Sequence, residues 1–299
     1  MKVLDYCWGI LLLGLLLGTS ACDIINSEEP IPAFIHIEDF ALNTTVGEGT
    51  DSRKITEVFV FVGGDLLGAY SLPADFPVLK TGQQQIQLFP GVQDNGIAAT
   101  PEIYPFYTTY TTDVELVALE TDTIRPVVEY IDGIKFAIQE TFENNLQVFR
   151  EDLDNDPQTQ LIFTRDPDEV FEGQQSAKVV VSEENPLFQV GSIRFDDLPE
   201  INRSAYIELN FRTEVPVEVG ILYTDDFART QADYRNVLAV STEWKKIYLN
   251  VTEQFTVLGG LPDIRDFQIG IRAAMAVENG AFQSGSREIL IDNIKLIHF

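Results

Sequence analysis

The stretch "AYIELNFR" (Ala205–Arg212) decides the fold class, because its side chains alternate in polarity with a period of two residues. In an extended strand, successive side chains point to opposite faces of the sheet. The apolar set is Ala205, Ile207, Leu209 and Phe211, and the opposite set is Tyr206, Glu208, Asn210 and Arg212. We expect a strand that packs the apolar set into a core and turns the other set outward.

Similar β-rich stretches fill residues 132–299. They are "SAKVVVS", "VGSIRFDDL", "VEVGILY", "KKIYLNV", "FQIGIRAAMAV" and "EILIDNIKLIHF". No helical periodicity stands out among them. Eight or more strands in about 160 residues predict a jelly-roll β-sandwich.

Residues 33–131 form a separate block that is also rich in β-forming residues. Within it, "EVFVFVGGDLLGAYSL" (Glu57–Leu72) has two such runs around Gly63-Gly64-Asp65, a pattern typical of a hairpin. About six or seven short strands in such a block predict an immunoglobulin-like β-sandwich, without the disulfide and tryptophan of antibody domains. The chain is therefore predicted to be all-β, with an immunoglobulin-like sandwich followed by a jelly roll.

The N-terminus carries a segment that predicts export. The apolar run Cys7–Gly18 is too short to cross a bilayer and is typical of a secretory signal. It is followed by "TSAC" (Thr19–Cys22), which resembles the lipobox of bacterial lipoproteins, although Thr19 stands where leucine is usual. The resemblance implies a signal peptide over residues 1–21, lipidation of Cys22 and a tether over residues 22–32. The alternative is ordinary cleavage that leaves Cys22 as a free thiol.

The tether "DIINSEEPI" (residues 23–31) is acidic and has no apolar periodicity, which favours a solvated linker. Its "SEE" at 27–29 resembles the acidic export tag of surface lipoproteins in Bacteroides-type bacteria, and the first block resembles N-terminal domains of such envelope lipoproteins. The resemblance implies a lipid anchor in the outer membrane and a membrane partner. Whether the chain faces the periplasm or the cell surface stays open.

Charge and composition exclude several function classes. Asp and Glu outnumber Lys and Arg by 47 to 20, a net charge of −27 that opposes binding to nucleic acid. The chain has two histidines, His36 and His298, too few for a histidine-rich zinc site. It has no glycine-rich phosphate loop and no nucleophile elbow. Glu288 and Asp292 share a strand face about 13 Å apart, too far for a pair of glycosidase carboxylates. We therefore predict that the protein is not an enzyme.

Several short motifs of the second block occur in a recognisable order. They are "FE" at 142–143, "EGQQSAKVVV" at 172–181, "STEWKKIYLNV" at 241–251 and "ILIDNIKL" at 289–296. The set resembles jelly-roll carbohydrate-binding and galactose-binding-like modules. The resemblance implies glycan binding and a structural calcium ion that joins Glu143 to Asp292. Strand parity places Asp292 on the face of Leu290, Ile294 and Leu296, so it points inward and needs a cation or hydrogen-bond donors such as backbone N–H groups.

Aromatic and basic residues of the second block are candidates for glycan contact. Trp244 and Tyr248 share one strand face, opposite Ile247 and Leu249, and could form an outward stacking platform. The alternative is that Trp244 caps the core. The segment Tyr223–Asn236 is predicted to be a long loop, and long loops on rigid sandwiches often bind ligands. Its candidate contacts are Tyr223, Tyr234, Arg229 and Arg235.

The sequence thus favours a lipid-anchored envelope lipoprotein that acts as a non-catalytic binding module for glycan. The main alternative is a structural, assembly or adhesion protein that binds another envelope protein. A hydrolase with an unrecognised site is the third. The glycan hypothesis rests on fold analogy, which is a weak basis for function.

Overall fold

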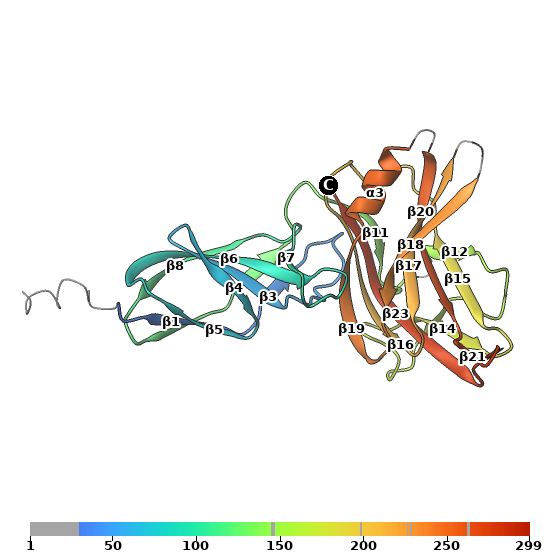
Figure 1. Ribbon diagram of the computed structural model, residues 1–299, viewed down its shortest axis with the longest axis horizontal. Helices are drawn as coiled ribbons and strands as arrows, with labels where there is room; N and C mark the ends of the chain where they lie inside the picture. The colour runs from blue at the N-terminus through green and yellow to red at the C-terminus, as the bar shows by residue number, and fades with distance from the viewer. Residues whose placement is uncertain (1–29, 145–146, 198, 226, 228, 262–263) are drawn as a thin grey trace, which may run out of the picture.

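A computed structural model describes residues 30–144, 147–197, 199–225, 227, 229–261 and 264–299. Most of these residues lie in β-strands, which form two β-sandwiches side by side (Figure 1). The first sandwich spans β1 to β10 and the second spans β11 to β23. The predicted all-β fold, an immunoglobulin-like sandwich followed by a jelly roll, is confirmed. The signal peptide, Cys22 and most of the tether lie outside the described residues.

The N-terminal sandwich packs two layers of strands around one apolar core. The first layer contains β1 (Ala33–Ile37), β5 (Ala74–Val78) and β9 (Thr121–Ile124), with β2 (Ala41–Asn43) paired to β10 (Val127–Glu129). The second contains β4 (Asp65–Ser71), β3 (Glu57–Val62), β6 (Gly82–Gln93) and β7 (Pro101–Ile103), and β8 (Tyr110–Leu116) pairs with β6. The predicted hairpin joins β3 to β4, and its turn places Gly63 and Gly64 at φ of 59° and 85°, which glycine adopts readily.

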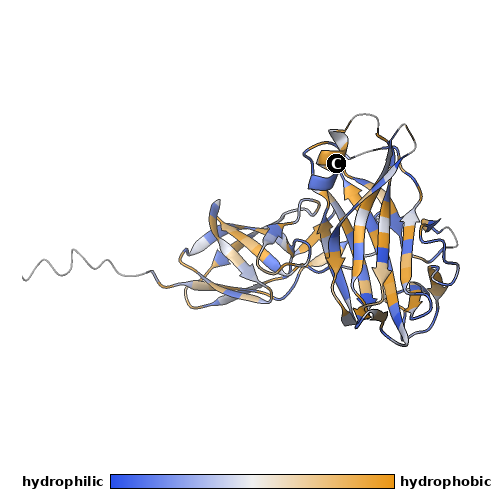
Figure 2. Cartoon of the chain, turned by 45° about the vertical axis from the view of Figure 1, so that its right-hand side comes forward, coloured by the Kyte–Doolittle hydropathy of each residue, from blue (hydrophilic) through white to orange (hydrophobic). Residues whose placement is uncertain are grey.

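The C-terminal sandwich has the strand order of a jelly roll. Its first sheet runs β13 (Ile162–Thr164), β14 (Ser176–Ser182), β23 (Ser286–His298), β16 (Ala205–Thr213) and β19 (Ser241–Asn250), and β11 (Lys135–Glu140) also pairs with β23. The second sheet runs β12 (Phe149–Asp152), β15 (Leu187–Ser192), β20 (Ile264–Ala274), β17 (Val217–Asp225) and β18 (Thr230–Leu238). Successive strands from β14 onward mostly alternate between the two sheets, as in a jelly roll. Apolar and polar residues alternate along these strands (Figure 2).

Two local predictions need correction. Residues 223–236 are not a long loop, because most of them belong to β17 and β18, which pair with each other from Val217–Leu238 to Thr224–Thr230. The polar outer face of this edge hairpin hides the alternation that would have indicated strands. The chain also forms a short helix, α3 (Thr252–Gly259), which buries Phe255 and Leu258 against the sandwich core. A short hairpin, β21 (Val277–Glu278) and β22 (Ala281–Phe282), precedes β23.

The stretch Ala205–Arg212 lies in β16, and its apolar set enters the C-terminal core as predicted. On its other face Tyr206, Glu208 and Asn210 are also buried, contrary to the prediction, because the N-terminal sandwich covers them, whereas Arg212 is half-buried. Tyr206 packs with the N-terminal core, together with Tyr248 and Ile297 of the neighbouring strands. Glu208 is 0% exposed. The outer face of the first sheet is therefore a domain interface.

Glu208 lies at the centre of a buried network in this interface. Its carboxylate accepts hydrogen bonds from Tyr104 (2.6 Å) and Tyr130 (3.1 Å) of the N-terminal sandwich. Lys246 Nζ lies 2.7 Å from Glu208 Oε2, an ion pair whose direction does not meet the geometry of a hydrogen bond. Lys295 Nζ donates to the Tyr130 hydroxyl at 3.1 Å and to Thr50 O at 3.0 Å. Both domains thus contribute polar groups that are satisfied only when the domains are joined.

The electrostatics of the network follow from its burial. Burial alone would raise the pKa of Glu208, but the charges of Lys246 and Lys295 outweigh it and hold that pKa below its usual value. Burial lowers the pKa of Lys295 to about 8, and Glu208 limits the fall. Burial and the charge of Glu208 raise the pKa of Tyr104 and Tyr130 well above the usual value. Both tyrosines therefore remain hydrogen-bond donors at neutral pH.

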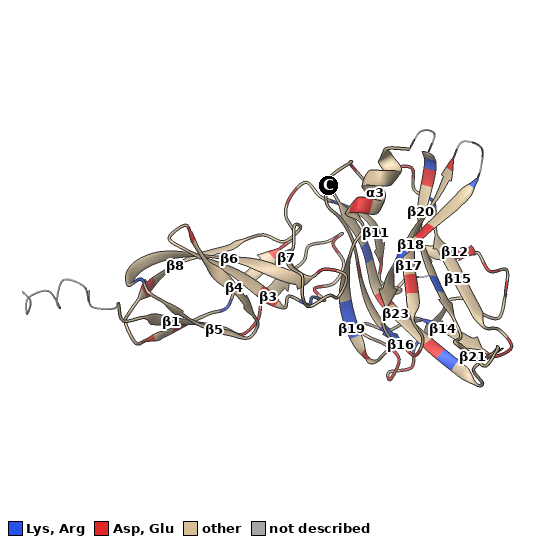
Figure 3. Cartoon of the chain, in the orientation of Figure 1, with Lys and Arg blue, Asp and Glu red and all other residues tan. Residues whose placement is uncertain are grey.

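Within the part of the chain that the structure describes, no helix is long and apolar enough to cross a membrane. Acidic residues lie on both sandwiches (Figure 3).

We predict that Glu208→Gln destabilises the folded protein by about 3–5 kcal/mol, because two buried ammonium groups then lose their counter-charge. Urea unfolding at pH 7 measures this change. The matched control is Glu200→Gln, which removes the same charge from the exposed pair with Arg203 and should change stability by less than about 0.5 kcal/mol. Equal effects of the two substitutions would contradict the role given to Glu208.

Candidate functional site

The outer face of the second jelly-roll sheet is the face that the N-terminal sandwich leaves uncovered (Figure 1). Along β20, Phe267, Ile269, Ile271 and Ala273 enter the core. The intervening residues Gln268, Gly270 and Arg272 must therefore point to the outer face. The paired residues of β15, β17 and β18 complete this face, which is built on rigid strands.

A row of glycines in register runs across this face. Gly191 of β15 and Gly220 of β17 both pair with Gly270 of β20. A Cβ atom added at Gly270 would collide with the hydroxyl of Tyr234, and one added at Gly220 would lie 2.8 Å from Tyr234 Cδ1. The glycines therefore leave the space in which the Tyr234 ring lies across the sheet.

Tyr234 is the centre of a small polar group. Gln189 Nε2 donates to the Tyr234 hydroxyl at 3.0 Å. The Arg272 guanidinium lies over the ring, with Cζ 4.1 Å from its centroid, and Arg272 Nε donates to Glu218 Oε2 at 2.5 Å. The Glu218 carboxylate raises the pKa of Arg272, and burial raises the pKa of Tyr234. Because Arg272 covers the outer side of the ring, Tyr234 is a support for Arg272 rather than an open stacking platform.

A groove of about 630 Å³ adjoins this group. Polar lining comes from Gln189, Glu218, Arg272 and Asp154, and apolar lining from Leu187, Phe188, Pro216, Val237, Ala273, Ala274 and Ala276. Its size and its mixture of apolar walls with a few converging polar groups are typical of small-ligand sites, which occupy about 300–1,000 Å³. We take this groove as the candidate functional site.

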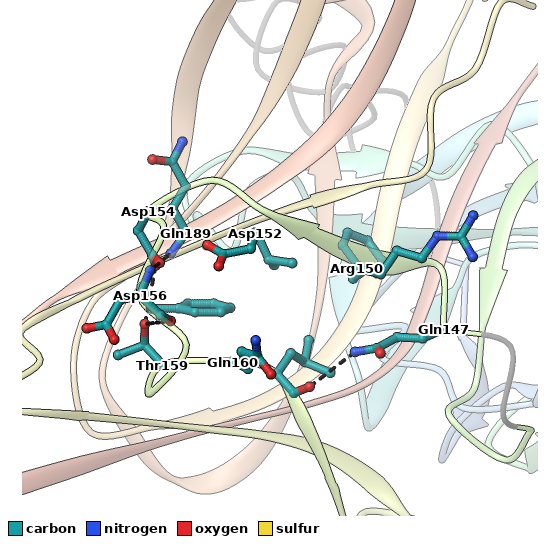
Figure 4. A pocket seen from close by; sticks show the side chains of 12 residues that line it. Gln147, Arg150, Asp152, Asp154, Asp156, Thr159, Gln160 and Gln189 are labelled. Atoms are coloured by element: carbon teal, nitrogen blue, oxygen red, sulfur yellow. Dashed lines mark hydrogen bonds between the residues drawn. The ribbon is translucent and has the colours of Figure 1, made fainter.

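A smaller pocket of about 130 Å³ shares Asp154 with the groove. Asp154 accepts hydrogen bonds from Gln189 N and Asp156 N, and Asp152 accepts one from Asn155 N. Burial raises the pKa of Asp154, with a further contribution from Asp152. Asp154 and Asp156 lie together at one end of this pocket, and Arg150 points away from them (Figure 4). Its volume is well below the range of about 300–1,000 Å³ that is usual for a ligand site.

The predicted contact residues do not form one site. Tyr234 does not line the groove itself but contacts Gln189 and Arg272, which do. Tyr223 and Arg235 line a different cavity of about 230 Å³ beside α3. Arg229 is bound by Asp225, to which both its side chain and its backbone N–H donate. A glycan role for these three residues stays a prediction.

The prediction that Trp244 and Tyr248 form an outward stacking platform is wrong for Tyr248. Parity placed Tyr248 correctly opposite the core, but the N-terminal sandwich covers that face, so Tyr248 is 1% exposed. Its hydroxyl contacts the Tyr107 hydroxyl at 3.2 Å and accepts from Lys54 N at 3.0 Å. Trp244 is half-buried against Phe171, with ring centroids 5.3 Å apart, and lies on the sheet opposite to the groove. Neither Trp244 nor Phe171 belongs to the apolar core of the C-terminal sandwich, so the structure does not support the alternative in which Trp244 caps the core.

Sequence reasoning missed Gln189, Glu218 and Arg272. Each follows the alternation of its strand, since each sits between core residues such as Phe188 and Val190 or Ile271 and Ala273. Parity could therefore have placed each on an outer face. What parity could not supply is the register that brings three separate strands together at one point.

The predicted metal residues lie near each other but differ in exposure. Asp292 is 0% exposed, as its parity predicted, and accepts hydrogen bonds from Ser176 Oγ (2.5 Å) and Asn293 N (2.8 Å). Glu143 is exposed and accepts from Gln174 N (2.8 Å) and Gln175 N (3.2 Å). The alternative of backbone donors thus holds for both. Burial raises the pKa of Asp292 to about 7, and the charges of Glu172 and Glu143 add to the rise.

The oxygen atoms around Asp292 would suit a hard cation such as calcium. The side-chain oxygen of Asn293 is buried and has no hydrogen-bond partner in the structure, while its Nδ2 donates to Glu172 at 2.5 Å. No ion pair joins Asp292 to a described Lys or Arg. Among the described residues, no group of three or more His, Cys, Asp and Glu side chains could hold a metal by itself. A calcium ion would therefore need amide or backbone oxygens in addition to carboxylates, which calcium accepts.

Comparisons with known proteins give only distant likenesses. No protein-family model and no curated protein matches the chain. A solved structure of the C-terminal family 22 carbohydrate binding module of Clostridium thermocellum Xyn10B has a TM-score of 0.37 and 12% identity, over 54% of this chain and 91% of that chain. A carbohydrate-binding module of the β-sandwich superfamily has a TM-score of 0.36 and 13% identity, over 90% and 99%.

A third likeness is to TmCBM61 in complex with β-1,4-galactotriose, with a TM-score of 0.27 and 10% identity, over 48% of this chain and 83% of that chain. Because each of these TM-scores is below 0.5, we draw no functional inference from the likenesses.

We predict that the stability contributed by Asp292 falls as pH rises from about 4 to about 7 in the absence of divalent cations. The pKa of Asp292 is about 7 in the folded protein, against about 3.9 when unfolded, so the folded protein binds more protons in this window. Unfolding of the wild type and Asp292→Asn in a chelator-containing buffer measures the effect. The difference between the two should change in favour of the variant as pH rises, and a pH-independent difference would contradict the prediction.

Proposed function

We propose that the protein is a non-catalytic binding module of the cell envelope that holds a glycan in the groove beside Tyr234. The observation that carries this proposal is the groove itself, in which Gln189, Glu218 and Arg272 converge on an apolar-walled space on a rigid sheet. Sugars have apolar C–H faces and hydroxyl groups that both donate and accept hydrogen bonds. The groove offers partners for each kind of surface.

The polar groups of the groove suit hydroxyl recognition. Arg272 uses Nε to hold Glu218, which leaves its terminal amino groups as donors. The Glu218 carboxylate can still accept a hydrogen bond from a ligand hydroxyl. The side-chain oxygen of Gln189 is a further acceptor, while the Nε2 of the same side chain donates to Tyr234. Side chains whose orientation is already set lose little entropy on binding.

The non-catalytic character of the proposal rests on how the groove's carboxylates are held. Glu218 is paired with Arg272, and Asp154 accepts backbone N–H groups of Gln189 and Asp156. Neither His36 nor His298 lines the groove. A carboxylate held in an ion pair, as Glu218 is, acts as a positioning or recognition group, whereas a general acid must be able to gain and release a proton.

Lipidation of Cys22 and attachment to the outer membrane belong to the same proposal. Strand β1, which follows the tether, lies in the part of the N-terminal sandwich far from the jelly roll (Figure 1). In a chain anchored at Cys22, the first sandwich would act as a spacer between the membrane and the groove. The buried network around Glu208 would hold that spacing fixed.

A protein ligand is the second candidate, favoured by the aliphatic edge of the groove. Leu187 is 53% exposed and Val237 is 54% exposed, and both line the groove. Exposed aliphatic side chains of this kind also contact protein surfaces. Such a partner would be another envelope protein, as in the structural or assembly alternative.

We further propose that calcium is held by Asp292, Glu143 and the Asn293 side-chain oxygen. Its support is the unpartnered Asn293 oxygen and the mutual repulsion of nearby carboxylates, both of which a bound cation would relieve.

We predict that calcium raises the melting temperature of the wild type and that Asp292→Asn removes this rise. Calcium binds only the folded site, so it stabilises the protein by mass action. Differential scanning fluorimetry in calcium and in chelator measures the shift. The control is Asp197→Asn, which removes an exposed carboxylate paired with Lys135 and should leave the calcium effect intact. A wild-type melting temperature that is the same in calcium and in chelator would rule out the calcium site.

We predict that Arg272→Ala reduces glycan binding by about tenfold or more, because charge-assisted hydrogen bonds contribute about 1.5–3 kcal/mol each. The measurement is affinity electrophoresis or calorimetry with a polysaccharide that retains the wild type. The control is Arg203→Ala, since Arg203 is likewise paired with an acid, Glu200, but does not line the groove.

Both variants should keep a melting temperature near that of the wild type. Undiminished binding by Arg272→Ala, or equal loss in both variants, would reject this groove as the glycan site. Wild-type binding to an envelope protein and to no polysaccharide would favour the second candidate.

A further inference from the structure

The charges that line the groove and its neighbouring pocket are predominantly negative. The groove is lined by Asp154, Glu218 and a single cation, Arg272. The pocket that shares Asp154 adds Asp152, Asp156 and Arg150. The groove itself thus has a net charge of −1, and the groove and the neighbouring pocket together have four carboxylates and two guanidinium groups, a net charge of −2. These carboxylates would repel a negatively charged ligand in the groove, and the net charge of −27 on the whole chain adds to the repulsion.

The one cation of the groove is already neutralised. Arg272 Nε lies 2.5 Å from Glu218 Oε2, and the guanidinium also rests on the Tyr234 ring. An acidic ligand group would have to displace Glu218 or lie beside it, and two neighbouring carboxylates repel each other. A hydroxyl group has no such cost, since it can accept from Arg272 and donate to Glu218.

Elsewhere on the uncovered sheet face, the basic side chain Arg194 is also neutralised by carboxylates. Arg194 lies at its other end, where its guanidinium pairs with Asp266 at 2.9 Å and with Glu151 at 3.2 Å. It also donates to Thr224 at 2.7 Å. Arg265 Nε also lies 3.1 Å from Asp266 Oδ2. Two carboxylates against two guanidinium groups leave no excess positive charge there for a ligand that extends along the sheet.

From this arrangement we infer that the groove selects uncharged glycan chains and rejects those that carry carboxylate or sulfate groups. The inference rests on the proposed glycan-binding function and specifies its ligand class. Selectivity comes from Glu218, because its carboxylate neutralises the charge of Arg272. Arg272 can then donate hydrogen bonds to an uncharged ligand but does not attract an anion.

The first test compares polymers with one backbone and different charge. Hydroxyethylcellulose and carboxymethylcellulose form such a pair, and a panel of neutral galactan, mannan and xylan with polygalacturonate and dextran sulfate extends it. We expect wild-type retention on one or more neutral polymers and at least tenfold weaker retention on the acidic ones. Retention on neutral polymers should hardly change when NaCl is raised to about 0.5 M, because screening acts on charge–charge interactions.

The outcomes separate the inference from the proposed function. Equal or stronger retention on an acidic polymer would overturn the charge selectivity while supporting glycan binding. Retention on no polymer would overturn the proposed function and the inference with it.

The second test removes the charge of Glu218. In Glu218→Gln, Arg272 loses its counter-charge and becomes available to an anion, so retention on carboxymethylcellulose or polygalacturonate should rise several-fold relative to the wild type. The matched control is Glu243→Gln, which makes the same change in net charge at an exposed position of β19, in the other sheet. An unchanged or equal response of the two variants would overturn the inference, and circular dichroism verifies that both are folded.

Discussion

The buried carboxylate of Glu208 is the interaction on which the arrangement of the two domains depends. It is surrounded by Lys246 and Lys295 of its own sandwich and by Tyr104 and Tyr130 of the other. A buried charge is tolerated only when its partners are in place, so separation of the domains would expose an interface designed around that charge. Because the N-terminal sandwich is held there, one jelly-roll sheet is covered on both faces. The other sheet keeps an open face, and the groove beside Tyr234 lies on it.

The sequence predicted the class of fold because alternation is a local property. In β16 the inward positions of Ile207, Leu209 and Phe211 follow from a period of two residues and nothing else. The same rule placed Asp292 in the interior of its sheet. What lies against the opposite face is not local. Parity identified the face that carries Glu208 and Tyr248 but could not show that a second sandwich covers it, so both were expected in solvent.

The candidate site was less predictable for the same reason. Gly191, Gly220 and Gly270 are ordinary strand glycines in the sequence, and only the register of three strands aligns them in one row, of which Gly220 and Gly270 lie against Tyr234. Gln189 and Arg272 belong to no recognisable sequence motif. They lie side by side only because β15 pairs with β20. Tyr234 was selected from the sequence, although as part of a loop. The paired strands β17 and β18 hold it on a sheet face instead, while Tyr223 and Arg235 line the cavity beside α3.

The central claim is that ligand binds to the open face of the second jelly-roll sheet. Hydrogen–deuterium exchange of the protein, with and without a neutral oligosaccharide from a polymer that retains it, tests this most directly. We expect the oligosaccharide to slow amide exchange in β15, β17 and β20 around Gln189, Glu218 and Arg272. Exchange in β19 and in the domain interface should not change. Protection confined to the region of Trp244, or to the cavity beside α3, would contradict the central claim.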